Sequence, residues 1–128
     1  MVPMIVGIGI DRIEIQRVAD VLARHPDRAA ERLFSPAERA ACERKADSAS
    51  CFAARFAAKE AFLKALGTGL SGGIAWHDVV VAARPGGQPV IVASGVAQEF
   101  LEARGATSVH LSFSHDGGSA VAIVVIEG

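Results

Sequence analysis

Residues 50–66 read SCFAARFAAKEAFLKAL, and this stretch carries the strongest helix signal in the chain. Alanine, leucine, lysine and glutamate are good helix formers, and Gly67 follows where a left-handed residue commonly ends a helix. On a helical wheel four residues form one narrow apolar stripe, namely Phe52, Phe56, Leu63 and Leu66. We therefore expect a long central helix that packs against the core.

Two charged residues interrupt this stripe. Lys59 falls inside it and Glu60 lies at its edge. Burying an unpaired charge is costly, so the pair needs an explanation. A structural explanation is that the Lys59 ammonium reaches water while Glu60 pairs with Lys64 four residues later. A functional explanation is that both charges serve a site, and the residues alone leave both open.

Shorter elements surround the central helix. An apolar run predicts a strand over 4–10, and helical spacing predicts a helix from Ile15 that stops at His25-Pro26. Ser35 and Glu38 form a capping box that should open a helix running to about Arg44. Further strands are expected over 79–83, 90–92, 108–114 and 119–126, with a helix over 95–103. This order predicts an α+β fold, one domain over 1–128, with a mainly antiparallel sheet packed by the long helix.

Composition excludes several classes of protein. The chain has 128 residues, a formal net charge of −1 and a pI of about 6.4, which argues against a nucleic-acid partner. No apolar run approaches the roughly 20 residues that cross a bilayer, and the start has no signal-peptide pattern. Cys42 and Cys51 match no metal or redox spacing, so we expect two reduced structural thiols. A cytoplasmic protein without a membrane partner is the expectation.

Two further places hold polar residues that need a reason. Asp11 comes directly after the first predicted strand, so it is either a helix N-cap or a carboxylate held at a strand end. The preceding Gly7-Ile8-Gly9 resembles part of a dinucleotide loop, but it lacks the third glycine. In the strand over 108–114, alternation leaves His110 on a polar face, where it is either a solvent-exposed structural histidine or part of a site.

Together these places match a known pattern. Residues 6–11 (VGIGID), residues 55–61 (RFAAKEA) with their continuation to Gly69, the turn 87–89 (GQP) and residues 110–115 follow one another at characteristic spacing. In this the chain resembles the holo-acyl-carrier-protein synthases, the short type of 4'-phosphopantetheinyl transferase. The matches extend from about residue 6 to residue 125, and the second motif is the most specific.

The resemblance implies an activity and a metal. It implies transfer of 4'-phosphopantetheine from coenzyme A to a serine of apo acyl carrier protein, in fatty acid biosynthesis, with release of adenosine 3',5'-bisphosphate. Asp11 and Glu60 match the magnesium ligands, and Lys64 joins them as a catalytic residue. Two carboxylates suit a cation that keeps several waters and binds substrate phosphate. Either Glu60 or a metal-activated water would deprotonate the serine.

The resemblance also implies binding residues and an assembly. The positions expected to bind coenzyme A are Arg55, Lys59, Lys64, Gly67, Thr68, Gly69, Gly87, Gln88, Pro89 and His110. Those expected to bind the carrier protein are Arg17, Arg28 and Arg32. The short members are homotrimers with active sites between subunits, so a homotrimer is expected here. Arg12 and Ala29 depart from the usual pattern.

Two other functions compete with this interpretation. One is a transferase domain that serves a large synthase instead of a free carrier protein. The other is a non-catalytic α+β module that only holds a nucleotide-like ligand. Loss of Asp11 or Glu60 would favour the binding module, and the sequence keeps both.

Overall fold

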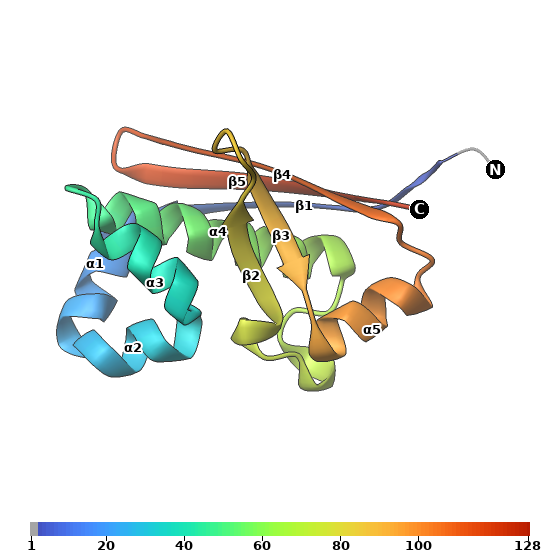
Figure 1. Cartoon of the computed structure of the whole chain (residues 1–128), viewed down its shortest axis with the longest axis horizontal. Helices are drawn as coiled ribbons and strands as arrows, with labels where there is room; N and C mark the ends of the chain where they lie inside the picture. The colour runs from blue at the N-terminus through green and yellow to red at the C-terminus, as the bar shows by residue number, and fades with distance from the viewer. Residues whose placement is uncertain (1–2) are drawn as a thin grey trace.

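The computed structural model describes residues 3–128 (Figure 1). In chain order its elements are β1 (Ile5–Glu14), α1 (Ile15–Arg24), α2 (Pro26–Leu33), α3 (Pro36–Glu43), α4 (Ser48–Leu66), the 3-10 turns η1 (Ser71–Gly73) and η2 (Trp76–Asp78), β2 (Val79–Ala83), β3 (Pro89–Ala93), α5 (Gly95–Ala103), β4 (Ser108–Asp116) and β5 (Ser119–Glu127). The α+β class is confirmed. No helix in this described range is long and apolar enough to cross a membrane.

The strands form two antiparallel sheets. Three strands pair in the order β1-β5-β4, and β2 pairs with β3 in a separate two-stranded sheet. The three long strands extend along one side of α4, and α1, α2 and α3 gather at one end of it (Figure 1). The expected antiparallel pairing around a long helix is therefore confirmed.

Strand β1 is longer than the sequence predicts, and this changes where Asp11 lies. The prediction ended at Ile10, whereas the ladder with β5 continues to the pair Glu14↔Ser119. Asp11 is thus neither a helix N-cap nor at a strand end, because it lies inside the ladder opposite Ala122. Alternation places Asp11 on the inner face of the sheet.

The helices agree with the sequence except at α2. Ser35 and Glu38 form the predicted capping box at the start of α3. Gly67 ends α4 with φ of 81°, as predicted. The helix α2 was missed, because its sequence PDRAAERL is mostly polar and only Ala30 is buried.

Helix α4 contributes to both hydrophobic clusters of the described chain. One cluster joins it to β2, α5 and β5, and the other joins it to α1 and α3. Alanines on several sides of α4 are fully buried, including Ala53, Ala57, Ala58 and Ala61. The buried surface of α4 is therefore wider than the predicted apolar stripe, since a helix between a sheet and other helices is apolar almost all round.

The two cysteines correct another prediction. Cys42 and Cys51 form a disulfide, with their Cα atoms 5.4 Å apart. The end of α3 packs beside the first turns of α4, and a short connection brings the two residues together. Spacing along the chain gave no sign of this, because only the packing of the two helices makes the thiols neighbours.

The backbones of β1 and α4 lie so close together that no side chain would fit between them at Gly7 or Gly9. A Cβ atom added at Gly7 would overlap the carbonyl oxygen of Ala65, and one added at Gly9 would overlap that of Ala61. Both glycines lie on the same inner face as Asp11. The glycines of the first motif therefore serve backbone packing, and no dinucleotide loop is present there.

The first prediction concerns this contact. Replacing Gly9 by alanine should destabilise the fold by at least about 3 kcal/mol, because the new methyl group meets backbone that no side-chain rotation can move. Arg12→Ala, at an exposed position of the same strand, is the control and should stay within about 0.5 kcal/mol of wild type. Chemical denaturation measures both, and a Gly9→Ala protein as stable as the control would contradict the contact.

Candidate active site

Asp11 and Lys64 meet between β1 and α4. The Lys64 ammonium donates to Asp11 Oδ1 at 2.9 Å and to the Ile10 carbonyl oxygen at 3.0 Å. The Asp11 side chain is 13% exposed, whereas that of Lys64 is 53% exposed. Lys64 thus binds Asp11 across the two elements, instead of serving only as a helical partner of Glu60.

Glu60 lies beside this pair. Burial raises its pKa, the negative charge of Asp11 raises it further, and Lys64 lowers it. Both acidic groups therefore repel each other in the absence of another cation. A divalent cation between them would relieve this repulsion, so the donor set fits the predicted metal. Within the described residues no group of three or more His, Cys, Asp or Glu side chains is placed to hold a metal, and magnesium needs only one or two carboxylates.

A hollow of about 320 Å³ opens beside the two carboxylates. Asp11, Glu60 and Arg17 all contribute to its wall. Its apolar lining comes from β1, α1, α2 and α4 and consists of Ile13, Val18, Val21, Leu22, Leu33 and Phe56. The site therefore combines acidic groups, an arginine and an apolar wall, which suits a ligand with a charged end and a carbon chain.

A neighbouring hollow of about 410 Å³ holds the other two predicted carrier-binding arginines. Arg28 and Arg32 line it together with Val21, His25 and Trp76. Both arginine side chains are exposed. Because Val21 and Leu33 line both hollows, the three predicted arginines lie along one surface made by α1 and α2.

Lys59 corrects a sequence prediction. It was expected to meet the pyrophosphate of coenzyme A, but it is fully buried and its ammonium donates to Glu38 Oε1 at 2.8 Å. It also donates to the Trp76 carbonyl oxygen at 3.2 Å. Desolvation lowers the Lys59 pKa and the Glu38 charge opposes this. Neighbouring positions on a helix point about 100° apart, so Lys59 faces the core while Glu60 faces β1.

Glu38 is the residue that sequence reasoning missed. Besides capping α3, its carboxylate accepts hydrogen bonds from Lys59 and from the backbone N–H of Val81 in β2, the latter at 2.9 Å. The capping-box pattern signalled only the bond that Glu38 accepts from the Ser35 backbone N–H. The network ties α3, α4 and β2 together at one fully buried carboxylate.

Two of the residues expected to bind coenzyme A, Gly67 and Thr68, lie at the end of α4. The N–H of Gly67 donates to the carbonyl oxygens of Leu63 and Lys64, and the N–H of Thr68 donates to that of Leu63. These bonds satisfy the last turn of α4. The two N–H groups are therefore used within the chain, and the binding of coenzyme A by these residues stays a prediction.

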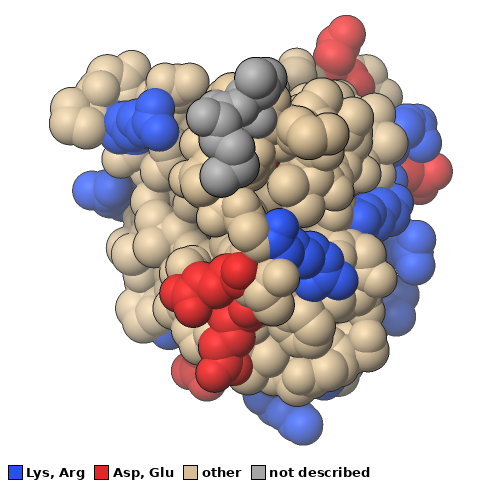
Figure 2. Space-filling model, turned by 90° about the vertical axis from the view of Figure 1, so that its right-hand side faces the viewer, with Lys and Arg blue, Asp and Glu red and all other residues tan. Residues whose placement is uncertain are grey.

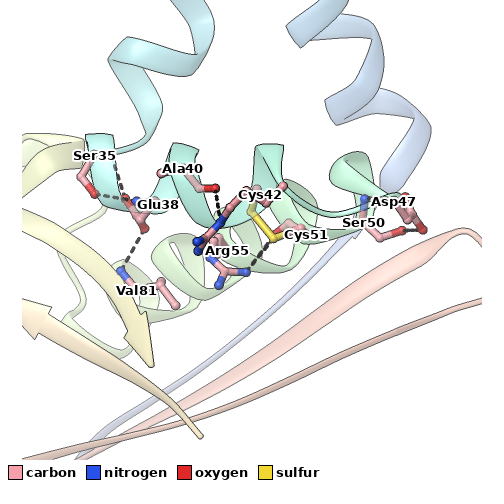
Figure 3. Close-up of a disulfide and its surroundings, with 10 residues drawn as sticks. Ser35, Glu38, Ala40, Cys42, Asp47, Ser50, Cys51, Arg55 and Val81 are labelled. Carbon is pink, nitrogen blue, oxygen red and sulfur yellow. Dashed lines mark hydrogen bonds between the residues drawn. A yellow bond between two sulfur atoms is a disulfide. The ribbon is translucent and has the colours of Figure 1, made fainter. Parts of the chain in front are cut away.

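Arg55, His110 and the turn at Gly87 lie apart from the carboxylates. Arg55 points from α4 toward α3 (Figure 3), and its Nη1 donates to Cys51. His110 lies exposed on the outer face of the sheet, where its Nε2 is 3.0 Å from Glu127 Oε1. Gln88 and its neighbours form the exposed turn between β2 and β3. One chain therefore does not bring all the predicted coenzyme A residues together.

Comparisons with known proteins show what the whole chain is similar to. A family model described as the 4'-phosphopantetheinyl transferase superfamily matches residues 7–124. The chain is 51% identical over 124 residues to a holo-[acyl-carrier-protein] synthase of Trichlorobacter lovleyi, covering 97% of this chain and 98% of the relative.

Solved structures are similar as well. A holo-[acyl-carrier-protein] synthase from Neisseria meningitidis superposes with a TM-score of 0.88 at 31% identity, covering 96% of this chain and 98% of that one. The Helicobacter pylori synthase in complex with coenzyme A gives 0.82 at 34% identity, covering 93% and 98%.

The second prediction separates a structural Lys59 from a phosphate ligand. Lys59→Met alone should cost about 3–5 kcal/mol of unfolding free energy, because it leaves Glu38 buried and unpaired. The double variant Glu38→Gln with Lys59→Met removes both charges and should recover most of that loss. Its KM for coenzyme A should equal that of wild type. A folded double variant with a coenzyme A KM raised about tenfold or more would show that Lys59 binds the substrate.

Proposed function

Because the chain belongs to the 4'-phosphopantetheinyl transferase superfamily, we propose that it is a holo-[acyl-carrier-protein] synthase. It transfers 4'-phosphopantetheine from coenzyme A to a serine of an apo acyl carrier protein and releases adenosine 3',5'-bisphosphate. The observation that carries this proposal is the meeting of Asp11, Glu60 and Lys64 beside a hollow lined by Arg17. The coenzyme A in the Helicobacter pylori structure supports the donor.

Asp11 and Glu60 would hold one magnesium ion. When bound, the ion supplies positive charge to the pyrophosphate, which is what phosphoryl transfer chiefly needs besides alignment. Lys64 adds a second positive charge from α4, and half of its side chain is open to substrate. The carrier serine attacks the β-phosphorus, and the bond from that phosphorus to the bridging oxygen breaks.

Glu60 is proposed to take the proton of the attacking serine. Burial and the Asp11 charge raise its pKa, and a bound cation would lower it again, so its position in the wall of the hollow is what suits it to accept the proton. A carboxylate has two oxygens, so one can contact the metal while the other accepts the proton. Asp11 would then only hold the cation, and the bond from Lys64 to its Oδ1 keeps its side chain in place.

The sheet supports a homotrimer. Its outer face exposes contiguous apolar side chains, namely Ile8, Ile10, Val121 and Ile123. Such a patch is typical of an interface. His110 lies on this outer face whereas Asp11 lies on the inner one, so a complete coenzyme A site needs residues of two chains. Arg55, His110 and the turn of Gly87 to Pro89 are proposed to bind the adenosine and 3'-phosphate end of coenzyme A.

The proposal also covers the absence of a nucleic-acid partner and the cellular location. At the end of the molecule where β1 begins and β5 ends, acidic and basic side chains lie in small separate groups (Figure 2). The described residues of that face thus offer no extended basic surface for nucleic acid. The cytoplasmic location stays a prediction, and the disulfide removes the reduced thiols as an argument for it.

The third prediction tests the function directly. Apo carrier protein incubated with this protein, coenzyme A and magnesium should gain the mass of one phosphopantetheine unit. Asp11→Asn and Glu60→Gln should each slow the transfer by about 100-fold or more, because each weakens metal binding without changing side-chain volume. Circular dichroism checks that both variants fold. Near-normal turnover in both would contradict the site.

The fourth prediction tests shared sites. Glu60→Gln and His110→Ala should each be poorly active alone, since they damage different ends of the site. Mixed trimers assembled from both variants should regain activity, because some sites then take an intact Glu60 from one chain and an intact His110 from its neighbour. Activity no greater than the average of the parents, in verified mixed trimers, would place each site within one chain.

The fifth prediction concerns the carrier protein. Carrier proteins of this kind are acidic around the target serine, so Arg17, Arg28 and Arg32 should steer and align them. Changing any one to glutamate should raise the KM for the carrier while the KM for coenzyme A stays constant. Added salt should weaken the wild type in the same way. If the triple reversal leaves carrier kinetics and their salt dependence unchanged, the arginines are only a solvated surface.

A further inference from the structure

The disulfide joins two helices next to a residue of the proposed substrate site. Cys42 lies one residue before the end of α3, and Cys51 lies in the first turns of α4 (Figure 3). Cys42 is fully buried and Cys51 is 7% exposed. The connection after Cys42, residues 43–47, is exposed throughout. Opening of the last turn of α3 would therefore bring the sulfurs to solvent, and it would loosen only the cluster that joins α4 to α1 and α3.

One sulfur of this bond holds the side chain of Arg55. Nη1 of Arg55 donates to Cys51 Sγ at 3.0 Å and makes a longer bond of 3.5 Å to the Cys51 carbonyl oxygen (Figure 3). The buried Nε of Arg55 has no hydrogen-bond partner among the described residues. Loss of hydration lowers the Arg55 pKa, and the Glu38 charge opposes this only in part.

These contacts are unusual for an arginine of this kind. A half-buried guanidinium normally pairs with a carboxylate, because its desolvated charge is costly. Here the side chain instead rests on a sulfur and a helix carbonyl, which are weak partners for a full positive charge. The position of Arg55 therefore depends on where Cys51 Sγ is held, and the bond to Cys42 holds it.

We propose that Cys42 and Cys51 form a reversible redox-modification site that sets the position of Arg55 and thereby the affinity for the 3'-phosphate of coenzyme A. This inference rests on the proposed role of Arg55 at the adenosine end of the substrate. A change between the disulfide and the two thiols would alter coenzyme A binding and leave Asp11, Glu60 and Lys64 unchanged.

The chemistry is thiol–disulfide exchange with a small thiol such as glutathione. A thiolate attacks Cys51 Sγ, the more exposed sulfur, and a mixed disulfide forms at Cys51 while Cys42 leaves as a thiolate and takes a proton. A second thiolate attacks the sulfur of the small thiol in that mixed disulfide, which frees Cys51 and releases the oxidised small molecule. Oxidation by the small disulfide is the reverse, so two thiols are consumed and two are formed.

Reduction should loosen Arg55. Two thiol sulfurs that are no longer bonded must lie farther apart, and Cys42 is completely enclosed, so either the end of α3 moves or the Cys51 side chain turns. Turning of the Cys51 side chain takes its Sγ away from the guanidinium, and movement of α3 leaves that Sγ without the bond that holds it in place. A mobile arginine must be ordered again when the phosphate binds, and this lowers the affinity.

The test compares two ligands in two redox states. The protein is equilibrated with oxidised glutathione or with dithiothreitol, its thiol state is verified by alkylation and mass spectrometry, and calorimetry measures binding of coenzyme A and of 3'-dephospho-coenzyme A. Reduction should weaken coenzyme A binding about fivefold, the low end of typical coupling between sites. Binding of the dephospho ligand should not change. Cys42→Ala should show the weaker value under both conditions.

Other results would overturn either the redox proposal or the role of Arg55. Equal coenzyme A affinity in the two verified states, or a pair that never changes state across the range of buffers, overturns the redox proposal. An Arg55→Met variant should bind coenzyme A weakly in both states, and wild-type affinity in that variant would overturn the role of Arg55. Transfer of phosphopantetheine to the carrier is measured separately, so failure of the enzymatic function would be recognised independently.

Discussion

The structure depends on the close approach of β1 to α4. The approach is possible only because Gly7 and Gly9 present no side chain toward the carbonyl oxygens of Ala65 and Ala61. A strand alternates its faces every second residue, so Asp11 is the next inward position after the two glycines. The contact that packs β1 against α4 therefore also places the Asp11 carboxylate beside Glu60 and Lys64 on the surface of α4.

A buried ion pair sets the orientation of α4 about its own axis. Lys59 is enclosed with Glu38, and the carboxylate of Glu38 also binds backbone of α3 and β2. A buried ion pair is poor evidence of stability, because desolvation can cost as much as the attraction returns. Its effect here is orientation. With Lys59 fixed toward the core, Glu60 is turned toward β1, and the acidic pair of the site is formed at the strand.

Much of this could be predicted from sequence, and the failures have physical reasons. The long helix, its glycine end and the capping box of α3 are local signals, and they were predicted correctly. Asp11 and Glu60 were chosen as charges out of place and Lys64 from the family resemblance, and the structure brings the three together. Lys59 was chosen for the same reason but is internal, since its partner Glu38 lies 21 residues away and looked like a simple cap. The disulfide and α2 depend on helix packing, which no local pattern reveals.

We propose that β1 and α4 place Asp11 and Glu60 so that both bind one divalent cation. X-ray diffraction at the manganese absorption edge, from crystals grown with coenzyme A and manganese, tests this placement. We expect one anomalous peak per chain, within coordination distance of a carboxylate oxygen of each residue. A peak elsewhere, or one that touches only one of the two carboxylates, would contradict it.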